Sequence, residues 1–508
     1  MAIDKLIQAA SEITDPAIVA KSKVEVGGVD PLGLRQINFD LMDKVLPGLN
    51  NVAEKLRPFV LMTWAWRRVR HVIERDKRGG ATEEQMRDFV DRIEAIYAWS
   101  QFLINPNAKI PGAQALKELV YGERESYKFG GKAWHSRRDT RRTSTGLISP
   151  LNYGPGLRSM GWLIPTEHTG VFAANPDLND MLDEFESEFE AELEHPAFNS
   201  LGSVKVDRED VQRWGELWAL SDLTDAERHA GLERLAGLPS DPLRRFGLAM
   251  VEEAVHINGE SEVDVSDIRR LMSEPPDEWL ENGDLHDSAD AWRRLQIRQL
   301  FRLSLEGLFY WTLQALVDGP ATTDRLAEQF LGMAETDGDL KADTWLSENQ
   351  SENPVDLLNE LNEALWARNW SQAASAILDG MNYCLVNARE EEWSSSEAFD
   401  RLPLKRALDE AQHWRELSLK EMTMKIIEVW ILAQHAYWCV LRGLADARGN
   451  GKTLLRLRIV MEEGGWTLTP EASARKAPVP TPDRLSTAIS LLDECRGDEA
   501  RNEIAFSK

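Results

Sequence analysis

The sequence predicts a mostly helical protein that is divided into several domains. The chain has 508 residues, which exceeds the roughly 100–200 residues of one domain. Apolar residues make up 43% and charged residues 28%, a composition typical of globular proteins with a buried core. Apolar side chains also recur at intervals of three and four residues over long stretches, as the buried faces of helices do. Together these features exclude a disordered chain, a low-complexity chain and a disulfide-bonded scaffold.

Local signals mark several helices of the N-terminal half. Thr82 with Gln85, and Thr224 with Glu227, have the spacing of capping boxes, in which the first side chain caps the helix and the second bonds back. The segment 177–194 holds nine acidic residues and no basic ones, with a helical stripe of leucine and phenylalanine. We interpret it as an amphipathic helix with a solvated acidic face; a DNA-mimicking surface is the weaker alternative.

A central buried helix is predicted from Trp292 to Val317. This segment begins amphipathic and becomes apolar on nearly every side, as a helix surrounded by protein does. Arg302 and Glu306 are four residues apart within it and therefore share a face. We interpret them as a structural ion pair, with a catalytic pair as the weaker alternative.

The C-terminal region combines helices with a predicted β-hairpin. A helix over 424–445 is followed by a turn at 448–451, and residues 453–461 then alternate as a strand does. Gly464 and Gly465 form the next turn, and 466–468 is the returning strand. Thr481 and Pro482 have the pattern of a helix N-terminus, with Thr481 as the cap and Pro482 as the first residue of the last helix. The order helix, hairpin, helix is compatible with a small winged-helix-like α+β module.

A phosphate-binding loop is disfavoured at Gly449–Thr453. Its first glycine would have to stand where Asp446 does, and a strand would have to precede it. A hairpin turn is therefore the better interpretation.

Four consecutive domains are predicted from composition and polar linkers. They are an N-terminal helical domain at 1–125, a basic aromatic loop region at 126–170, a central helical domain at 171–333 and a C-terminal helical domain with the hairpin at 355–508. No apolar run reaches the ~18–20 residues of a membrane span, and the N-terminus lacks the pattern of a secretory signal. We expect a cytoplasmic protein without a membrane partner.

Basic charge is concentrated near the N-terminus of an acidic chain. The whole chain has a net charge of −26, yet its first 170 residues hold 25 basic and 20 acidic side chains. Arginines interleaved with aromatic residues suit phosphate contacts and base stacking. The predicted nucleic-acid contacts are therefore Lys128, Lys132, Trp134, Arg137, Arg138, Arg141, Arg142 and Arg158, followed by Arg67, Arg68 and Arg70. The alternative is a loop packed on the acidic body of the protein.

Motifs for catalysis or metal binding are not found in the sequence. The three cysteines form no CxxC pair, the nine histidines have no ligand spacing, and no HExxH or GxSxG occurs. We expect no catalytic residue, no metal and no cofactor. An enzyme with a dispersed, metal-dependent, nuclease-like site remains an alternative.

The most distinctive sequence motifs lie between residues 30 and 66. They comprise Asp30-Pro-Leu-Gly33, Leu46-Pro-Gly48, Arg57-Pro-Phe59 and Trp64-Ala-Trp66. This block of about 40 residues resembles the opening of uncharacterised helical proteins encoded in bacterial phage-defence islands. The resemblance implies a cytosolic accessory subunit that acts beside a helicase or nuclease.

The sequence therefore supports one leading hypothesis and two alternatives. The first is a non-catalytic subunit of a bacterial antiphage defence system that binds DNA or RNA through its basic N-terminal region. The second is a protein-interaction scaffold that binds a helicase or nuclease partner on its acidic surface. The third is the dispersed enzyme site described above.

Overall fold

The computed structural model describes residues 30–76, 81–108, 110, 122, 124–130, 152–237, 242–258, 264–283, 285–347, 353–388, 399–450, 455–469, 472 and 476–497. The predicted mostly helical fold class is confirmed over these residues. Contacts divide the chain into a first unit, 1–42 with 266–481, and a second unit, 43–265 with 482–508. Each unit thus combines two stretches that are distant in sequence. The four domains predicted from composition are consecutive stretches and do not include such a combination.

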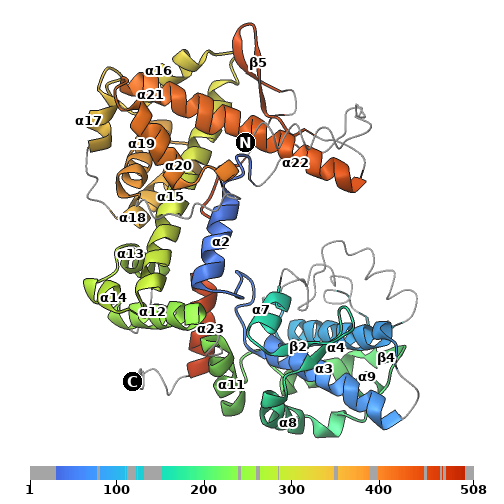
Figure 1. The fold of residues 1–508 in the computed structure, drawn as a ribbon. Helices are drawn as coiled ribbons and strands as arrows, with labels where there is room; N and C mark the ends of the chain where they lie inside the picture. Colours follow the sequence, from blue (N-terminus) through green and yellow to red (C-terminus); the bar gives the residue numbers. More distant parts are fainter. Residues whose placement is uncertain are drawn as a thin grey trace. The chain divides into compact units, whose positions relative to one another are not determined.

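The first unit is a bundle of helices around one long helix (Figure 1). Its helices are α13 (Val265–Ser273), α14 (Asp277–Glu281), α15 (His286–Ala315), α16 (Thr323–Met333), α17 (Ala342–Ser347), α18 (Pro354–Ala367), α19 (Trp370–Asn387), the 3₁₀ turn η4 (Phe399–Arg401), α20 (Leu404–Trp414), α21 (Leu419–Lys425), the π-helix η5 (Ile426–Ala433) and α22 (Gln434–Asn450). Helix α2 (Arg35–Val45) begins in this unit and ends in the second.

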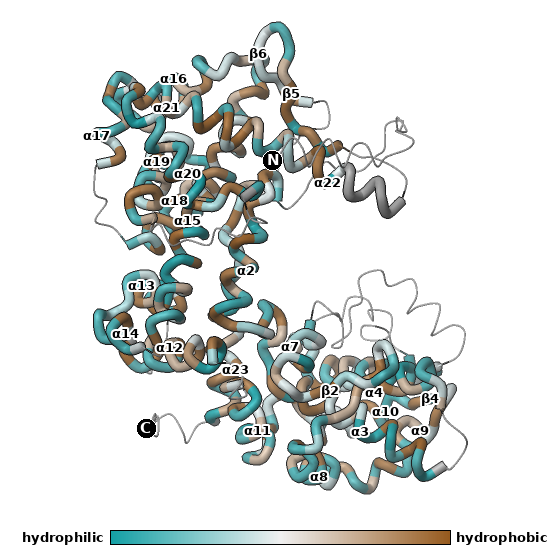
Figure 2. The backbone as a smooth tube through the Cα atoms, viewed as in Figure 1, coloured by the Kyte–Doolittle hydropathy of each residue, from teal (hydrophilic) through white to brown (hydrophobic). Residues whose placement is uncertain are grey.

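Helix α15 is the predicted central helix, and its burial confirms that prediction. From Leu295 to Leu313 every side chain is buried, and α18, α19 and η5 pack against it. Figure 2 shows hydrophobic residues along these helices. Close approach requires small residues, and a Cβ added to Gly380 of α19 would lie 2.6 Å from Ser304 Oγ of α15.

The predicted hairpin is present in the first unit. Strands β5 (Ile459–Glu462) and β6 (Gly465–Leu468) are antiparallel, with Ile459 opposite Leu468. Ala321 and Trp466 exchange two backbone hydrogen bonds of 3.1 and 2.9 Å, which fasten the hairpin to the segment before α16. The first strand is shorter than predicted, and α22 continues as helix to Asn450 through the turn expected at 448–451.

The second unit is also helical, with two small sheets. Its elements are α3 (Arg57–Asp76), α4 (Glu83–Ile104), β1 (Ser126–Phe129), α7 (Gly154–Ser159), β2 (Leu163–Pro165), β3 (Phe172–Ala174), η2 (Pro176–Leu178), α8 (Asn179–Ser187), η3 (Glu190–Glu192), α9 (Pro196–Asn199), β4 (Val204–Asp207), α10 (Arg208–Leu217), α11 (Asp225–Ala236), α12 (Pro242–Asn258) and α23 (Leu485–Arg496). Strand β1 pairs with β4 and strand β2 with β3, both antiparallel.

Both predicted capping boxes are confirmed, and one of them also carries a buried charge. Thr82 and Gln85 cap α4, and Thr224 and Glu227 cap α11. The second oxygen of Glu227 lies 2.9 Å from Arg57 Nη1, and both side chains are fully buried. One carboxylate thus caps α11 and neutralises the first residue of α3.

The C-terminal helix differs from its prediction in start and neighbours. Helix α23 begins at Leu485, not at Pro482, and packs against α11 and α12 in the second unit. The hairpin and α23 therefore belong to different units, and do not form one small module. The predicted acidic helix is also divided, because α8 ends at Ser187 and the 3₁₀ turn η3 follows.

Candidate nucleic-acid interface

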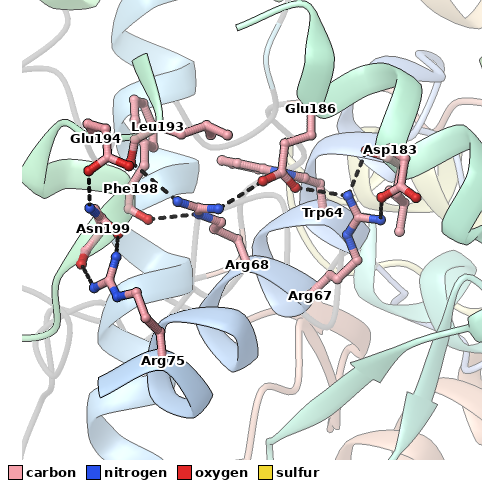
Figure 3. A network of polar contacts seen from close by, with 11 residues as sticks. Trp64, Arg67, Arg68, Arg75, Asp183, Glu186, Leu193, Glu194, Phe198 and Asn199 are labelled. Carbon is pink, nitrogen blue, oxygen red and sulfur yellow. Dashed lines mark hydrogen bonds and ion pairs between the residues drawn. The ribbon is translucent and has the colours of Figure 1, made fainter. Parts of the chain in front are cut away.

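The first basic cluster lies on α3, where the structure gives two of its arginines internal partners. One face of α3 is apolar and buries Trp64 and Trp66 completely or nearly so. Arg67, on the next turn, places Nη1 2.6 Å from Asp183 and Nη2 2.9 Å from Glu186 (Figure 3). Its side chain is only 8% exposed. This guanidinium group is therefore enclosed by acceptors of α8.

Arg68 is held by the same acidic segment. Its Nη1 lies 2.8 Å from Glu186, and its Nε donates to the carbonyl oxygen of Phe198 at 3.0 Å. Trp64 Nε1 donates to Glu186 as well, at 3.1 Å (Figure 3). The acidic segment 177–194 thus neutralises Arg67 and Arg68 of α3. We correct the sequence-based choice of Arg67 and Arg68 accordingly, because a phosphate would have to displace these acceptors.

Arg70 is different, because it lies on the exposed side of α3. It makes no ion pair with any residue in the described ranges. Of the three arginines chosen from this cluster, only Arg70 presents its charge to solvent.

The second basic region begins on β1, with two lysines side by side. Lys128 is directly opposite Lys205 of β4, and both are exposed, while Tyr127, Phe129, Val204 and Val206 face the interior. Like charges at opposed positions of a sheet repel each other. Lys205 is balanced by Asp207 at 3.1 Å, whereas Lys128 has no ion-pair partner among the described residues. The pair leaves positive charge at the end of β1.

The remaining predicted contacts of this basic region follow β1 in the sequence. Arg158, on α7, is exposed, and its guanidinium carbon lies 5.9 Å from the ring centre of Phe172. The other predicted contacts lie outside the described residues: Lys132, Trp134, Arg137, Arg138, Arg141 and Arg142. The described part of the region therefore contributes Lys128 before this segment and Arg158 after it.

Lys205 was missed by sequence reasoning. A signal was present, since Val204-Lys205-Val206-Asp207 alternates as a half-buried strand does. What the sequence lacked was the pairing of β4 with β1, which joins segments about 75 residues apart.

The charged pair of the central helix is structural, as interpreted from the sequence. Arg302 Nη1 lies 2.6 Å from Glu306, and both side chains are almost fully buried. Arg35 of α2 approaches Glu306 to 3.6 Å, and Arg302 also donates to the carbonyl oxygen of Val479 at 2.8 Å. The Arg302–Glu306 pair thus connects three segments of the first unit.

One thiol lies near an imidazole, but the pair has the wrong charge state for nucleophilic catalysis. Cys439 Sγ is 3.7 Å from both ring nitrogens of His435. Burial raises the pKa of Cys439 to about 11 and lowers the pKa of His435 to about 4. Both groups are therefore neutral near pH 7, whereas a catalytic cysteine needs a thiolate.

In the described ranges, no group of three or more His, Cys, Asp or Glu side chains could hold a metal ion. Within those ranges, no helix has the length and apolar character needed to cross a membrane. No protein-family model, no curated protein and no solved structure matches the chain.

Proposed function

We propose that this protein is a non-catalytic, cytoplasmic subunit that binds DNA or RNA through the basic region of its second unit. The observation that supports it best is the exposed pair Lys128 and Lys205 on the β1–β4 sheet. Lys128 lies just before the segment 131–151, where the sequence places four arginines within six residues. Exposed lysine and arginine favour phosphate contacts, since binding releases counterions from the nucleic acid.

The acidic remainder of the chain supports a local contact. A net charge of −26 repels a polyanion from most of the surface. A nucleic acid would therefore approach where basic side chains are exposed, whether unpaired, as at Lys128, or in a solvent-exposed ion pair, as at Lys205. Arg67 and Arg68 are no longer part of this proposal, and Arg70, Lys128, Arg158 and Lys205 are its described contacts. A role in antiphage defence, beside a helicase or nuclease, follows from the N-terminal resemblance alone.

The test is the binding of labelled single- and double-stranded DNA and RNA to the full chain at about 50 and 200 mM salt. One variant combines Lys128→Ala, Arg158→Ala and Lys205→Ala, and a second replaces Arg137, Arg138, Arg141 and Arg142 by alanine. We expect the wild type to lose roughly 10³-fold in affinity over this salt range if it makes six or more phosphate contacts. Each variant should bind more weakly and show a shallower salt dependence.

A matched control removes the same charge from the first unit. Lys341, Lys425 and Lys476 lie at its surface, and their replacement by alanine should leave affinity and salt dependence unchanged. The proposal fails if the wild type binds no nucleic acid at 50 mM salt, or if the control weakens binding as much as the other variants do. Stoichiometric binding of a basic protein without nucleic-acid binding would favour the scaffold instead.

A further inference from the structure

One tryptophan of the first unit projects from the surface. Trp366, in the last turn of α18, is 77% exposed. The other tryptophans in the described ranges are buried or half-buried. An indole ring carries a large apolar area, and tryptophan is enriched in protein–protein interfaces relative to the rest of the surface. The exposure of Trp366 therefore points to a contact with another molecule.

Trp366 also lacks the internal contacts that the half-buried tryptophans make. Trp370, four residues later, packs on Tyr310 with ring centres 5.4 Å apart, and Trp466 Nε1 donates to Thr323 Oγ1 at 3.0 Å. Trp366 makes no hydrogen bond and no ring contact with any residue in the described part of the chain. Its side chain is thus free to insert into a partner, as the central residues of interfaces do.

The helix that carries this tryptophan is acidic. Helix α18 contains Asp356, Glu360 and Glu363 and no basic residue. Asp356 is paired with Arg270 at 2.6 Å. Glu363 is exposed and makes no ion pair with any residue in the described ranges. It precedes Trp366 by three residues, so the two side chains are neighbours on the helix surface. A free carboxylate thus lies beside the exposed indole ring.

Three further features favour a cation at this place. The carbonyl oxygens of the last turn of a helix carry partial negative charge. The sequence from 321 to 388 holds 12 acidic and three basic residues. The face of an indole ring attracts cations, and this chain already contains one example, with the guanidinium carbon of Arg401 at 4.6 Å from the ring centre of Trp438. No cation of the described residues lies over Trp366.

The same charges disfavour other occupants. A nucleic acid or an anionic membrane would be repelled by the acidic residues of this segment. A second copy of the chain, bound through a two-fold contact, would bring the same acidic patch against itself. A partner of opposite charge meets no such repulsion.

We propose that the Trp366 surface, formed by Glu360, Glu363 and Trp366 of α18, binds a basic segment of a partner protein. The indole ring would be buried against apolar side chains of that segment, with an arginine or lysine on its face or on Glu363. This site belongs to the first unit, and it does not depend on the nucleic-acid contacts proposed for the second.

The first experiment selects random phage-displayed peptides on the full chain, with Trp366→Ala as the counter-selection. We expect the enriched peptides to carry an excess of arginine and lysine. One enriched peptide is then synthesised and titrated with each protein by fluorescence anisotropy. Trp366→Ala should weaken its binding roughly 30-fold or more, because a central interface anchor is lost. Since the ring is exposed, circular dichroism should show an unchanged fold.

Charge variants test the carboxylate separately. Glu363→Gln should weaken binding roughly 2- to 5-fold at low salt and less at physiological salt. Glu462→Gln is the matched control, because it removes the same charge from an exposed position of β5 in the same unit, and it should leave the affinity unchanged. Arg368→Ala removes the basic residue nearest to Trp366 in sequence, and it should strengthen binding by a similar factor.

The proposal is overturned if no enriched peptide prefers wild type to Trp366→Ala, if the enriched peptides are not basic, or if Glu462→Gln weakens binding as much as Glu363→Gln does. Analytical ultracentrifugation tests the remaining occupant, because a wild-type dimer that Trp366→Ala abolishes would assign the surface to a second copy instead. None of these outcomes involves nucleic acid, so this proposal and the proposed function can fail independently.

Discussion

Gly33 lies against the indole ring of Trp438, a residue about 400 positions later in the chain. Its φ of +74° suits glycine, and a Cβ at this position would lie 2.5 Å from Trp438 Cδ2. Neighbouring backbone carbonyls complete the contact, because Pro31 and Leu32 accept hydrogen bonds from His435 and Gln434. The distinctive Asp30-Pro-Leu-Gly33 turn is thus the segment that attaches the described N-terminus to α22.

Gly33→Ala should destabilise the first unit by about 2–4 kcal/mol, from left-handed backbone strain and from overpacking against the indole ring. Urea unfolding followed by circular dichroism measures the change. The same substitution in a Trp438→Leu background should cost less, because the ring that the Cβ meets is gone. Equal costs in the two backgrounds would contradict the packing explanation.

Glu186→Gln should lower the free energy of unfolding of the second unit by about 2–4 kcal/mol, since Arg67 and Arg68 would lose their shared carboxylate in a largely buried site. Asp183→Asn is the matched control, because Asp183 also pairs with Arg67 but its side chain is 72% exposed. The control should cost less than about 1 kcal/mol. Chemical denaturation distinguishes the two, and a similar loss in both would argue against the network of Figure 3.

His435 should make the protein less stable in mild acid. Burial lowers the pKa of His435 to about 4, whereas an imidazole in the unfolded chain titrates near a pKa of about 6.5. Between these values only the unfolded state binds the proton. The stabilisation is therefore complete above about pH 7 and declines by about 3 kcal/mol as the pH falls to 4.

The measurement compares wild type with His435→Gln across this pH range. The variant should lose less stability between pH 7 and pH 4.5, whatever its stability at neutral pH. Parallel curves for the two proteins would show that the imidazole is not neutral in the folded state.

The three cysteines should be unreactive in the folded protein. Cys384, Cys439 and Cys495 are buried, and burial raises the pKa of Cys439 to about 11 and of Cys495 to about 12. At pH 8 the folded chain should release almost no colour from a disulfide reagent, and the unfolded chain should release three equivalents. Rapid labelling of one thiol in the folded state would reopen the question of a nucleophilic cysteine.

The candidate interface was only partly predictable from the sequence. Charge counting identified basic residues, and Arg70, Lys128 and Arg158 are indeed exposed. It could not show that Arg67 and Arg68 pair with α8, because the acidic partner lies more than 100 residues away. The convergence of Arg442 and Arg458 at one pocket was missed for the same reason, since these residues become neighbours only when the segment before the hairpin packs on α22.

The sequence by itself determined the helical class, the starts of α4 and α11, the buried α15 and the approximate position of the hairpin. These features depend on interactions within about four residues, or between adjacent strands, which periodicity and capping residues encode directly. Only the tertiary structure decided which charges remain exposed, and which stretches form the two units. Those outcomes depend on how helix faces pack over long sequence separations, because packing brings an arginine either to a carboxylate, as at Glu186, or to an open pocket, as at Arg442.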